Sequence, residues 1–175
     1  MSNKKKKTLF TISIILLVIL DVILFCFIYL KDTKRINKYE NEYLEFEYTG
    51  DYILKDDKHK ITISKQDKSG QIDIVISELS KEVIERDKNI IISEVNNDFE
   101  NNNSTFTLSY SNEVKINNYV VKNFIYIDEN NNKQIDLNYI IDNDKLVLIS
   151  YTNVDKYFDL YISNVINILE SIKIK

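Results

Sequence analysis

The chain contains one histidine, His59, and this limits the catalytic chemistry that it could perform. A serine nucleophile is usually activated by a histidine base within hydrogen-bond reach. His59 follows the polar residues 56–58, whose composition is typical of a turn. No serine lies in a glycine-rich nucleophile elbow, because the only glycines are Gly50 and Gly70. We therefore predict that His59 is neither a catalytic base nor a metal ligand, and we predict no catalytic residue elsewhere.

Residues 128–133, with the sequence DENNNK, begin like a calcium-binding loop. Their first, third and fifth residues are Asp, Asn and Asn, and such loops place oxygen ligands at alternate positions. The pattern then fails, because Lys133 stands where glycine is needed and Tyr139 where a bidentate glutamate should be. We predict a hairpin tip and no metal site. Phosphate-binding loops, zinc-ligand spacings and dinucleotide fingerprints are also missing, so we predict no cofactor.

The charge of the chain is unevenly distributed and disfavours nucleic-acid binding. Residues 1–38 hold eight of the 23 basic and two of the 27 acidic side chains, which leaves residues 39–175 with 15 basic and 25 acidic side chains and a net charge of −10. An acidic domain repels phosphate backbones. We therefore expect no nucleic-acid partner, and the simplest role of this charge is to keep the domain soluble.

The apolar segment from Thr8 to Leu30 predicts a single transmembrane helix. Its 23 residues would span roughly 34 Å at about 1.5 Å per residue, enough to cross a hydrocarbon core of about 30 Å with some tilt. A cleaved signal peptide has a shorter apolar region and a small-residue cleavage site, and neither is present. A lipoprotein signal needs a small residue before its cysteine, whereas Phe25 precedes Cys26, the only cysteine. We therefore predict an uncleaved signal anchor in the lipid bilayer.

Basic residues flank this segment on both sides, four within the first seven positions and four among residues 31–38. Positive charge favours the cytoplasmic side. The N-terminal lysines are contiguous, and a long acidic domain can cross the membrane largely regardless of its charge. We predict a single-pass cell-membrane protein with a cytoplasmic tail at 1–7, a transmembrane helix at 8–30, a linker at 31–38 and an extracellular domain at 39–175.

Asp21 interrupts the predicted transmembrane helix near its centre. A carboxylate at that depth costs on the order of 3 kcal/mol on insertion scales. The residues one turn before it, Leu17 and Val18, offer no hydroxyl to bond it. Two interpretations stay open. Asp21 contacts another transmembrane helix inside the membrane, or it is a protonated residue tolerated by an otherwise very apolar helix.

Strand-like patterns and two helical stripes dominate the remainder. Residues 36–42 resemble a short, charged, helical linker. Alternating apolar residues then predict strands at 43–48, 52–54, 60–65, 71–78, 105–110, 119–127, 134–141 and 145–151. The tripeptide 142–144, Asp-Asn-Asp, predicts a tight hairpin.

Apolar residues recur at helical spacing in two places. The segment 79–102 contains Ile91, Ile92, Val95 and Phe99, and the C-terminal segment has one broad apolar face made of Phe158, Tyr161, Ile162, Val165, Ile168, Leu169 and Ile172. The order of strands, helix, strands and helix predicts an α+β domain, a mainly antiparallel sheet with packed helices.

This layout resembles the Mog1/PsbP-like fold family, which often occurs as secreted or membrane-tethered domains in bacteria. The family opens with an aromatic strand that runs into a Tyr-Pro-x-x-Trp-like turn, matched here by residues 46–52 with Thr49 in place of the proline and Tyr52 in place of the tryptophan. It closes with a helix and a Ser-Ile-Lys-type ending, matched by residues 171–174. The resemblance covers about residues 40–175. It implies binding or assembly roles more than any particular chemistry.

The sequence therefore predicts a non-catalytic binding or assembly module of the bacterial cell envelope, tethered by its anchor, with a membrane or envelope protein as partner. A small-molecule-binding sensor domain is the first alternative, although a tail of seven residues holds no output domain. An envelope enzyme is the second alternative, disfavoured by the missing motifs.

Overall fold

The computed structural model describes residues 35–65 and 70–175. The predicted tail, the transmembrane helix at Thr8–Leu30 and its Asp21 lie outside the described residues. Within the part that is described, every helix is too short or too polar to cross a bilayer.

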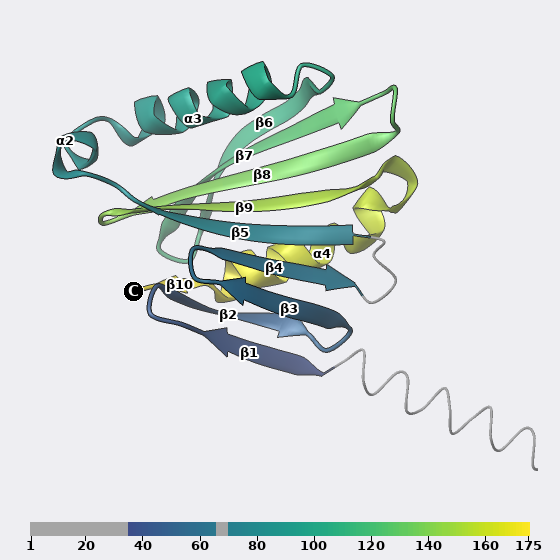
Figure 1. The fold of residues 1–175 in the computed structure, drawn as a ribbon, viewed down its shortest axis with the longest axis horizontal. Helices are drawn as coiled ribbons and strands as arrows, with labels where there is room; N and C mark the ends of the chain where they lie inside the picture. Colours follow the sequence, from purple (N-terminus) through teal and green to yellow (C-terminus); the bar gives the residue numbers. More distant parts are fainter. Residues whose placement is uncertain (1–34, 66–69) are drawn as a thin grey trace, which may run out of the picture.

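In residues 35–65 and 70–175, ten strands form two antiparallel sheets. The large sheet has seven strands in the order β3-β4-β5-β9-β8-β7-β6 (Figure 1). Its strands are β3 (Tyr52–Asp57), β4 (Lys60–Lys65), β5 (Gly70–Glu78), β9 (Lys145–Val154), β8 (Lys133–Asp142), β7 (Tyr119–Asp128) and β6 (Thr107–Ile116). The small sheet has the order β1-β2-β10 and consists of β1 (Ile36–Glu40), β2 (Leu44–Thr49) and β10 (Lys173–Ile174). The predicted α+β class and its mainly antiparallel sheet are confirmed.

Two long helices cover opposite faces of the large sheet. Helix α3 (Lys88–Asn102) lies on one face, and α4 (Asp155–Ser171) lies on the other, beside the small sheet (Figure 1). The alternation of side chains along β9 assigns the faces, since Val147 and Ile149 belong to the core under α4 while Leu146 belongs to the core under α3. A short helix, α2 (Lys81–Ile84), precedes α3.

The core under α4 is the larger of the two. It joins isoleucines of β4 and β5 to Leu44 and Phe46 of the small sheet and to the apolar face of α4. Burying each such side chain contributes about 1.5–3 kcal/mol relative to exposure. The predicted apolar face of α4 is confirmed, with Phe158, Val165 and Ile168 at most 3% exposed.

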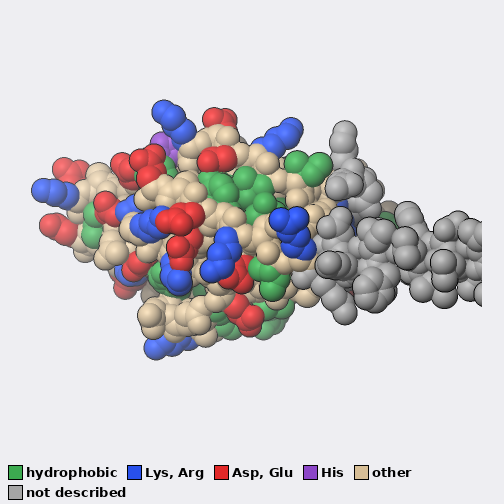
Figure 2. All heavy atoms as spheres, turned by 90° about the horizontal axis from the view of Figure 1, so that it is seen from below, with side chains coloured by type: hydrophobic (Ala, Val, Ile, Leu, Met, Phe, Trp, Pro, Cys, Tyr) green, Lys and Arg blue, Asp and Glu red, His purple; other side chains and the backbone are tan. Residues whose placement is uncertain are grey.

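The surface is charged on the side where β1, β2 and β3 lie. Figure 2 shows acidic and basic side chains interspersed there, with hydrophobic groups between them. Several of these charges form exposed ion pairs, such as Lys38–Glu47 at 3.3 Å. Pairs of this kind add little stability and mainly keep the surface soluble.

The prediction of a helical linker at residues 36–42 was wrong, because this segment begins the small sheet. Strand β1 pairs with β2 along its whole length, from Ile36 opposite Thr49 to Glu40 opposite Glu45. Tyr39 packs its ring against Phe46 with centroids 5.2 Å apart. Pairing and burial against β2 outweigh the weak helical preference of a charged sequence.

Two other boundaries differ from expectation. The helical segment predicted at 79–102 is divided, and α3 begins only at Lys88, where the Asp87 carboxylate accepts a hydrogen bond of 2.7 Å from the Asn89 backbone amide. Strand β6 continues to Ile116, six residues past the predicted end. Its polar second half lacks the apolar alternation of a half-buried strand because β6 is an exposed edge.

Candidate functional site

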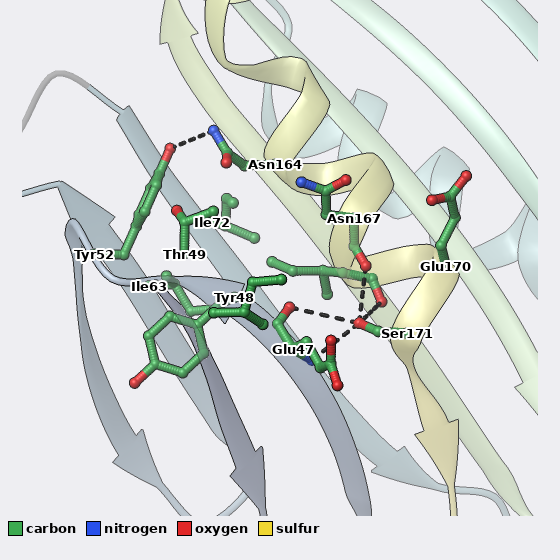
Figure 3. Close-up of a pocket in the computed structure, with 12 residues that line it drawn as sticks. Glu47, Tyr48, Thr49, Tyr52, Ile63, Ile72, Asn164, Asn167, Glu170 and Ser171 are labelled. Carbon is green, nitrogen blue, oxygen red and sulfur yellow. Dashed lines mark hydrogen bonds between the residues drawn. The ribbon is translucent and has the colours of Figure 1, made fainter. Parts of the chain in front are cut away.

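A hollow opens between helix α4 and strand β2, and its floor is formed by the large sheet (Figure 3). Its volume is about 280 Å³. The side chains of Ile63, Ile72 and Ile168 are almost completely buried and make the floor apolar. The remaining lining residues surround the mouth, and they are Ile36, Glu47, Tyr48, Thr49, Tyr52, Asn164, Asn167, Glu170 and Ser171.

One end of the hollow is closed by an aromatic ring bonded to the helix. The Asn164 amide nitrogen donates to the Tyr52 hydroxyl at 2.9 Å and to the Tyr161 carbonyl at 3.2 Å, as Figure 3 shows for the first of these bonds. Behind this end, the Lys65 ammonium lies 3.8 Å from the Tyr161 ring centroid and 3.6 Å from the Asp51 carboxylate. The Asn164 bond therefore ties the Tyr52 ring to helix α4.

The other end is fixed by Ser171. The Glu47 backbone amide donates to the Ser171 hydroxyl at 2.9 Å, and that hydroxyl donates to the Asn167 carbonyl at 2.8 Å. The chain then continues directly into β10, which pairs with β2 through Lys173 and Ile174. Because β2 and α4 are joined in two ways, the hollow between them is preformed.

The polar groups at the mouth are amides and carboxylates. Glu47 pairs with Lys38, whose side chain is 83% exposed. Within residues 35–65 and 70–175, Glu170 has no ion-pair partner and the Asn167 amide makes no side-chain hydrogen bond. The described lining contains no basic side chain.

A second, shallower hollow of about 810 Å³ lies on the other side of Ser171 and shares Glu47, Glu170 and Ser171 with the first. Its lysines have partners, with Lys173 at 2.5 Å from Glu45. Its lining contains the buried Phe46 and Ile172 but also the paired Lys38 and Lys173. We take the hollow between α4 and β2, whose described lining has no basic side chain, as the candidate site.

The chemical groups of the hollow are apolar side chains, amides and carboxylates. The hollow has no histidine, cysteine or lysine on its lining, and the part of the chain that is described contains no cluster of three or more potential metal-ligating side chains. Its groups can hold an apolar body and hydrogen-bond a polar end.

Comparison with known proteins identifies the fold. The cyanobacterial PsbP of Synechocystis sp. PCC 6803 superimposes with a TM-score of 0.64 at 14% identity, covering 80% of this chain and 92% of that one. The fold is PsbP-like. LpqN of Mycobacterium tuberculosis, described as involved in cell envelope biogenesis, has a TM-score of 0.57 at 8% identity, covering 81% of this chain and 91% of that one. A Bacteroides thetaiotaomicron VPI-5482 protein has a TM-score of 0.53 at 12% identity, covering 82% and 49%.

Sequence comparison adds no closer relationship. No protein-family model matches the chain, and no curated protein matches it. Identities this low show the PsbP-like fold and leave its function to the site itself. The turn that carried the predicted resemblance joins β2 to β3, and its Tyr52 closes the candidate site.

The residues weighed for chemistry in the sequence lie elsewhere in this PsbP-like fold. His59 is exposed in the β3–β4 turn, with its ring 5.1 Å from that of Tyr43. Asp128 lies at the β7–β8 hairpin tip, as predicted, where its carboxylate accepts hydrogen bonds from the backbone amides of Asn130 at 3.1 Å and Asn131 at 3.2 Å. Neither residue lines the hollow.

The polar side chains of α4 that line the hollow were not predicted from the sequence. The sequence suggests that Asn164 lies on the outer face of the last helix, but its amide lines the hollow and bonds Tyr52. A usable signal was present, because Asn164, Asn167 and Ser171 recur at intervals of three and four residues beside the apolar stripe. Only the position of β2 in the structure shows that this second stripe lies next to another strand.

Proposed function

We infer that this chain is a membrane-anchored binding or assembly module of the bacterial cell envelope, with its PsbP-like domain outside the cytoplasm and Thr8–Leu30 as its anchor. The observation that carries this proposal is the preformed hollow, apolar at its floor and lined at its mouth by amides and carboxylates. Sites of this composition bind and orient a partner group.

The similarity to LpqN supports the envelope assignment, since that protein is described as involved in cell envelope biogenesis. The position of the hollow supports a partner in or near the membrane. Ile36 lines the hollow, and the predicted anchor ends at Leu30, six residues earlier. Six extended residues reach about 20 Å, so the anchored domain would hold the hollow within that distance of the bilayer.

The proposal is tested in intact membranes. A photo-crosslinking amino acid at position 167 lies at the hollow, whereas the same group at Glu129, an exposed residue of the β7–β8 hairpin, serves as the matched control. We expect a discrete adduct of defined mass from position 167 only, in a protein that stays in the membrane after alkaline carbonate washing. Equal labelling from both positions would contradict a binding role for the hollow. Release of a shortened soluble form would contradict the anchor.

A small-molecule sensor remains the alternative, because amide groups converge on the hollow. Its volume of about 280 Å³ lies at the lower end of pockets for drug-sized molecules, which begin at about 300 Å³. A small ligand or a single side chain of a protein partner would fill it.

A further inference from the structure

We propose that the hollow between α4 and β2 takes a cationic side chain, arginine or lysine, from a basic segment of a protein partner. This inference rests on the proposed binding function and names the class of its ligand. The two charged residues on the described lining are both acidic, Glu47 and Glu170. Glu47 lies at the end of the hollow opposite Tyr52, and Figure 3 shows the Glu170 carboxylate turned away from Glu47, on the outer side of α4.

Glu170 carries negative charge where a helix disfavours it. It lies in the last turn of α4, which contains no basic residue. The carbonyl groups at a helix C-terminus carry partial negative charge and favour a cation there. Among the described residues Glu170 also has no ion-pair partner, so its charge is available to a ligand.

Four lysines on the elements around the hollow already pair with carboxylates. Their ion pairs are Lys65–Asp51 at 3.6 Å, Lys38–Glu47 at 3.3 Å, Lys175–Glu40 at 2.6 Å and Lys173–Glu45 at 2.5 Å. An exposed pair such as Lys38–Glu47 is weak, and a ligand cation that is better placed can replace its lysine. The Glu47 carboxylate can therefore face a ligand.

The floor fits the uncharged part of such a side chain. Arginine and lysine bury their methylene stems on apolar surface while the charged head stays near polar groups. Ile63, Ile72 and Ile168 provide that surface, and the Tyr52 ring stands beside them.

Hydrogen-bond acceptors are present beside the stem. The Asn164 amide uses its nitrogen for Tyr52 and Tyr161, which leaves its oxygen as an acceptor. The Asn167 amide, one helical turn away, has no other side-chain bond among the described residues. Arginine and lysine offer several donors and no acceptor, which matches this set.

The net negative charge of the whole domain also favours a cationic partner. Residues 39–175 carry 15 basic and 25 acidic side chains, and an acidic surface speeds the approach of basic chains. On the side where β1 and β2 lie, Figure 2 shows acidic side chains interspersed with basic ones. An anionic lipid surface or a nucleic acid would be repelled by the same field.

The test uses the full chain in an uncharged detergent and two capped tripeptides, acetyl-Gly-Arg-Gly-amide and its neutral isostere with citrulline in place of arginine. Dissociation constants come from saturation-transfer NMR. We expect the arginine peptide to bind about tenfold more tightly than the citrulline peptide, because charged hydrogen bonds are roughly twice as strong as neutral ones. High salt should shrink the difference.

Substitutions test whether the preference for arginine depends on the carboxylates of the hollow. Glu170→Gln should reduce the preference for arginine several-fold, and the double variant with Glu47→Gln should abolish it. Glu129→Gln makes the same charge change outside the hollow and should leave the preference intact.

Equal affinity for both peptides, binding of neither, or a preference that survives the double variant would overturn the cationic assignment. Displacement of the arginine peptide by equimolar phosphocholine would assign the hollow to a lipid headgroup instead. A crosslink from position 167 would still support a binding function in each of these cases.

Discussion

Helices α3 and α4 lie on opposite faces of one sheet and are held there by different means. The side chains that helix α4 is seen to bury fully are apolar, and Val165 and Ile168 are each 1% exposed. Helix α3 buries Ile91 and Ile92 and, in the next turn, the polar residue Asn96, which is 4% exposed. Helix α4 therefore forms its hydrogen bonds to β2 at its edge, through Ser171, whereas α3 carries a hydrogen-bonded amide inside its core.

The buried polar group under α3 belongs to a network. The Asn96 amide donates to the Tyr126 hydroxyl at 2.6 Å, and that hydroxyl donates to the Glu100 carboxylate at 2.6 Å. The Tyr139 hydroxyl donates to the Asn96 amide oxygen at 3.4 Å. Burial and the neighbouring Glu100 raise the pKa of Tyr126 to about 12. Tyr126 therefore remains a neutral donor at physiological pH.

This difference shows on which side of the PsbP-like domain a preformed binding site can lie. Dry packing and the Ser171 bonds fix α4 against β2, so the hollow between them is rigid. Preorganised groups bind with less loss of conformational entropy. Helix α3 offers no comparable second wall, because it packs against one sheet face alone.

The largest loss of stability should follow from a charged substitution in the apolar core under α4. Ile168→Asp places an unpaired carboxylate in the apolar core under α4. We expect a loss of about 3–5 kcal/mol, a large share of a typical stability of about 5–15 kcal/mol. The control is Ile166→Asp on the same helix, since Ile166 is 45% exposed. Thermal unfolding followed by circular dichroism should separate the two variants clearly, and equal melting temperatures would contradict the packing of α4.

A smaller effect should follow on the α3 side. Tyr126→Phe removes the hydroxyl that links Asn96 to Glu100, and the Asn96 amide keeps only its longer, direct bond of 3.3 Å to the Glu100 carboxylate. We expect a loss of about 1–2 kcal/mol for the two short bonds removed. Tyr110→Phe is the matched control, because Tyr110 is 52% exposed. Urea titrations of both variants measure the loss, and no difference between them would mean that the network adds nothing to the packing.

The sequence predicts α4 well and the small sheet poorly, for one physical reason. The α4 stripe from Phe158 to Ile172 is apolar at every inward position, so its periodicity reports the burial directly. Strand β1 forms because β2 lies beside it, and a pattern confined to residues 36–40 contains no trace of that distant pairing. The hollow depends on the same long-range contact, so its floor was predictable as core while its function was not.

Ser171 offers a test of how far the rigid hollow depends on a single side chain. Ser171→Ala removes the acceptor of the Glu47 backbone amide, a bond of 2.9 Å between residues far apart in the sequence. The expected loss is about 1 kcal/mol, the usual net contribution of one hydrogen bond. Thr152→Ala, in the middle of the half-exposed surface of β9, is a suitable control. Amide hydrogen exchange at β2 should rise in Ser171→Ala, and unchanged protection would show that β1 and β10 hold the strand without this bond.

The subtlest expected difference between the two faces is their response to pH. Under α4, Asp136 is 4% exposed and is bonded by the amides of Asn123 and Asn138 without a cation. Burial raises the pKa of its carboxyl group despite these amides. On the α3 face, Asp128 has its pKa lowered, first by the Asn131 side-chain amide.

These opposite shifts predict opposite slopes of stability. A raised folded-state pKa means that the protonated form of Asp136 is favoured in the folded protein. Its contribution is complete below the unfolded pKa of about 3.9 and declines as pH rises through the folded value. The lowered pKa of Asp128 contributes stability above about 3.9 that is lost as the pH falls through its folded value. Unfolding free energies of Asp136→Asn and Asp128→Asn, measured between pH 3 and 7, should each lack one of these slopes. Relative to the parent, Asp136→Asn should gain stability as pH rises and Asp128→Asn should lose it. If the two variants followed parallel curves, the two carboxylates would experience the same environment and the contrast between the two faces would fail.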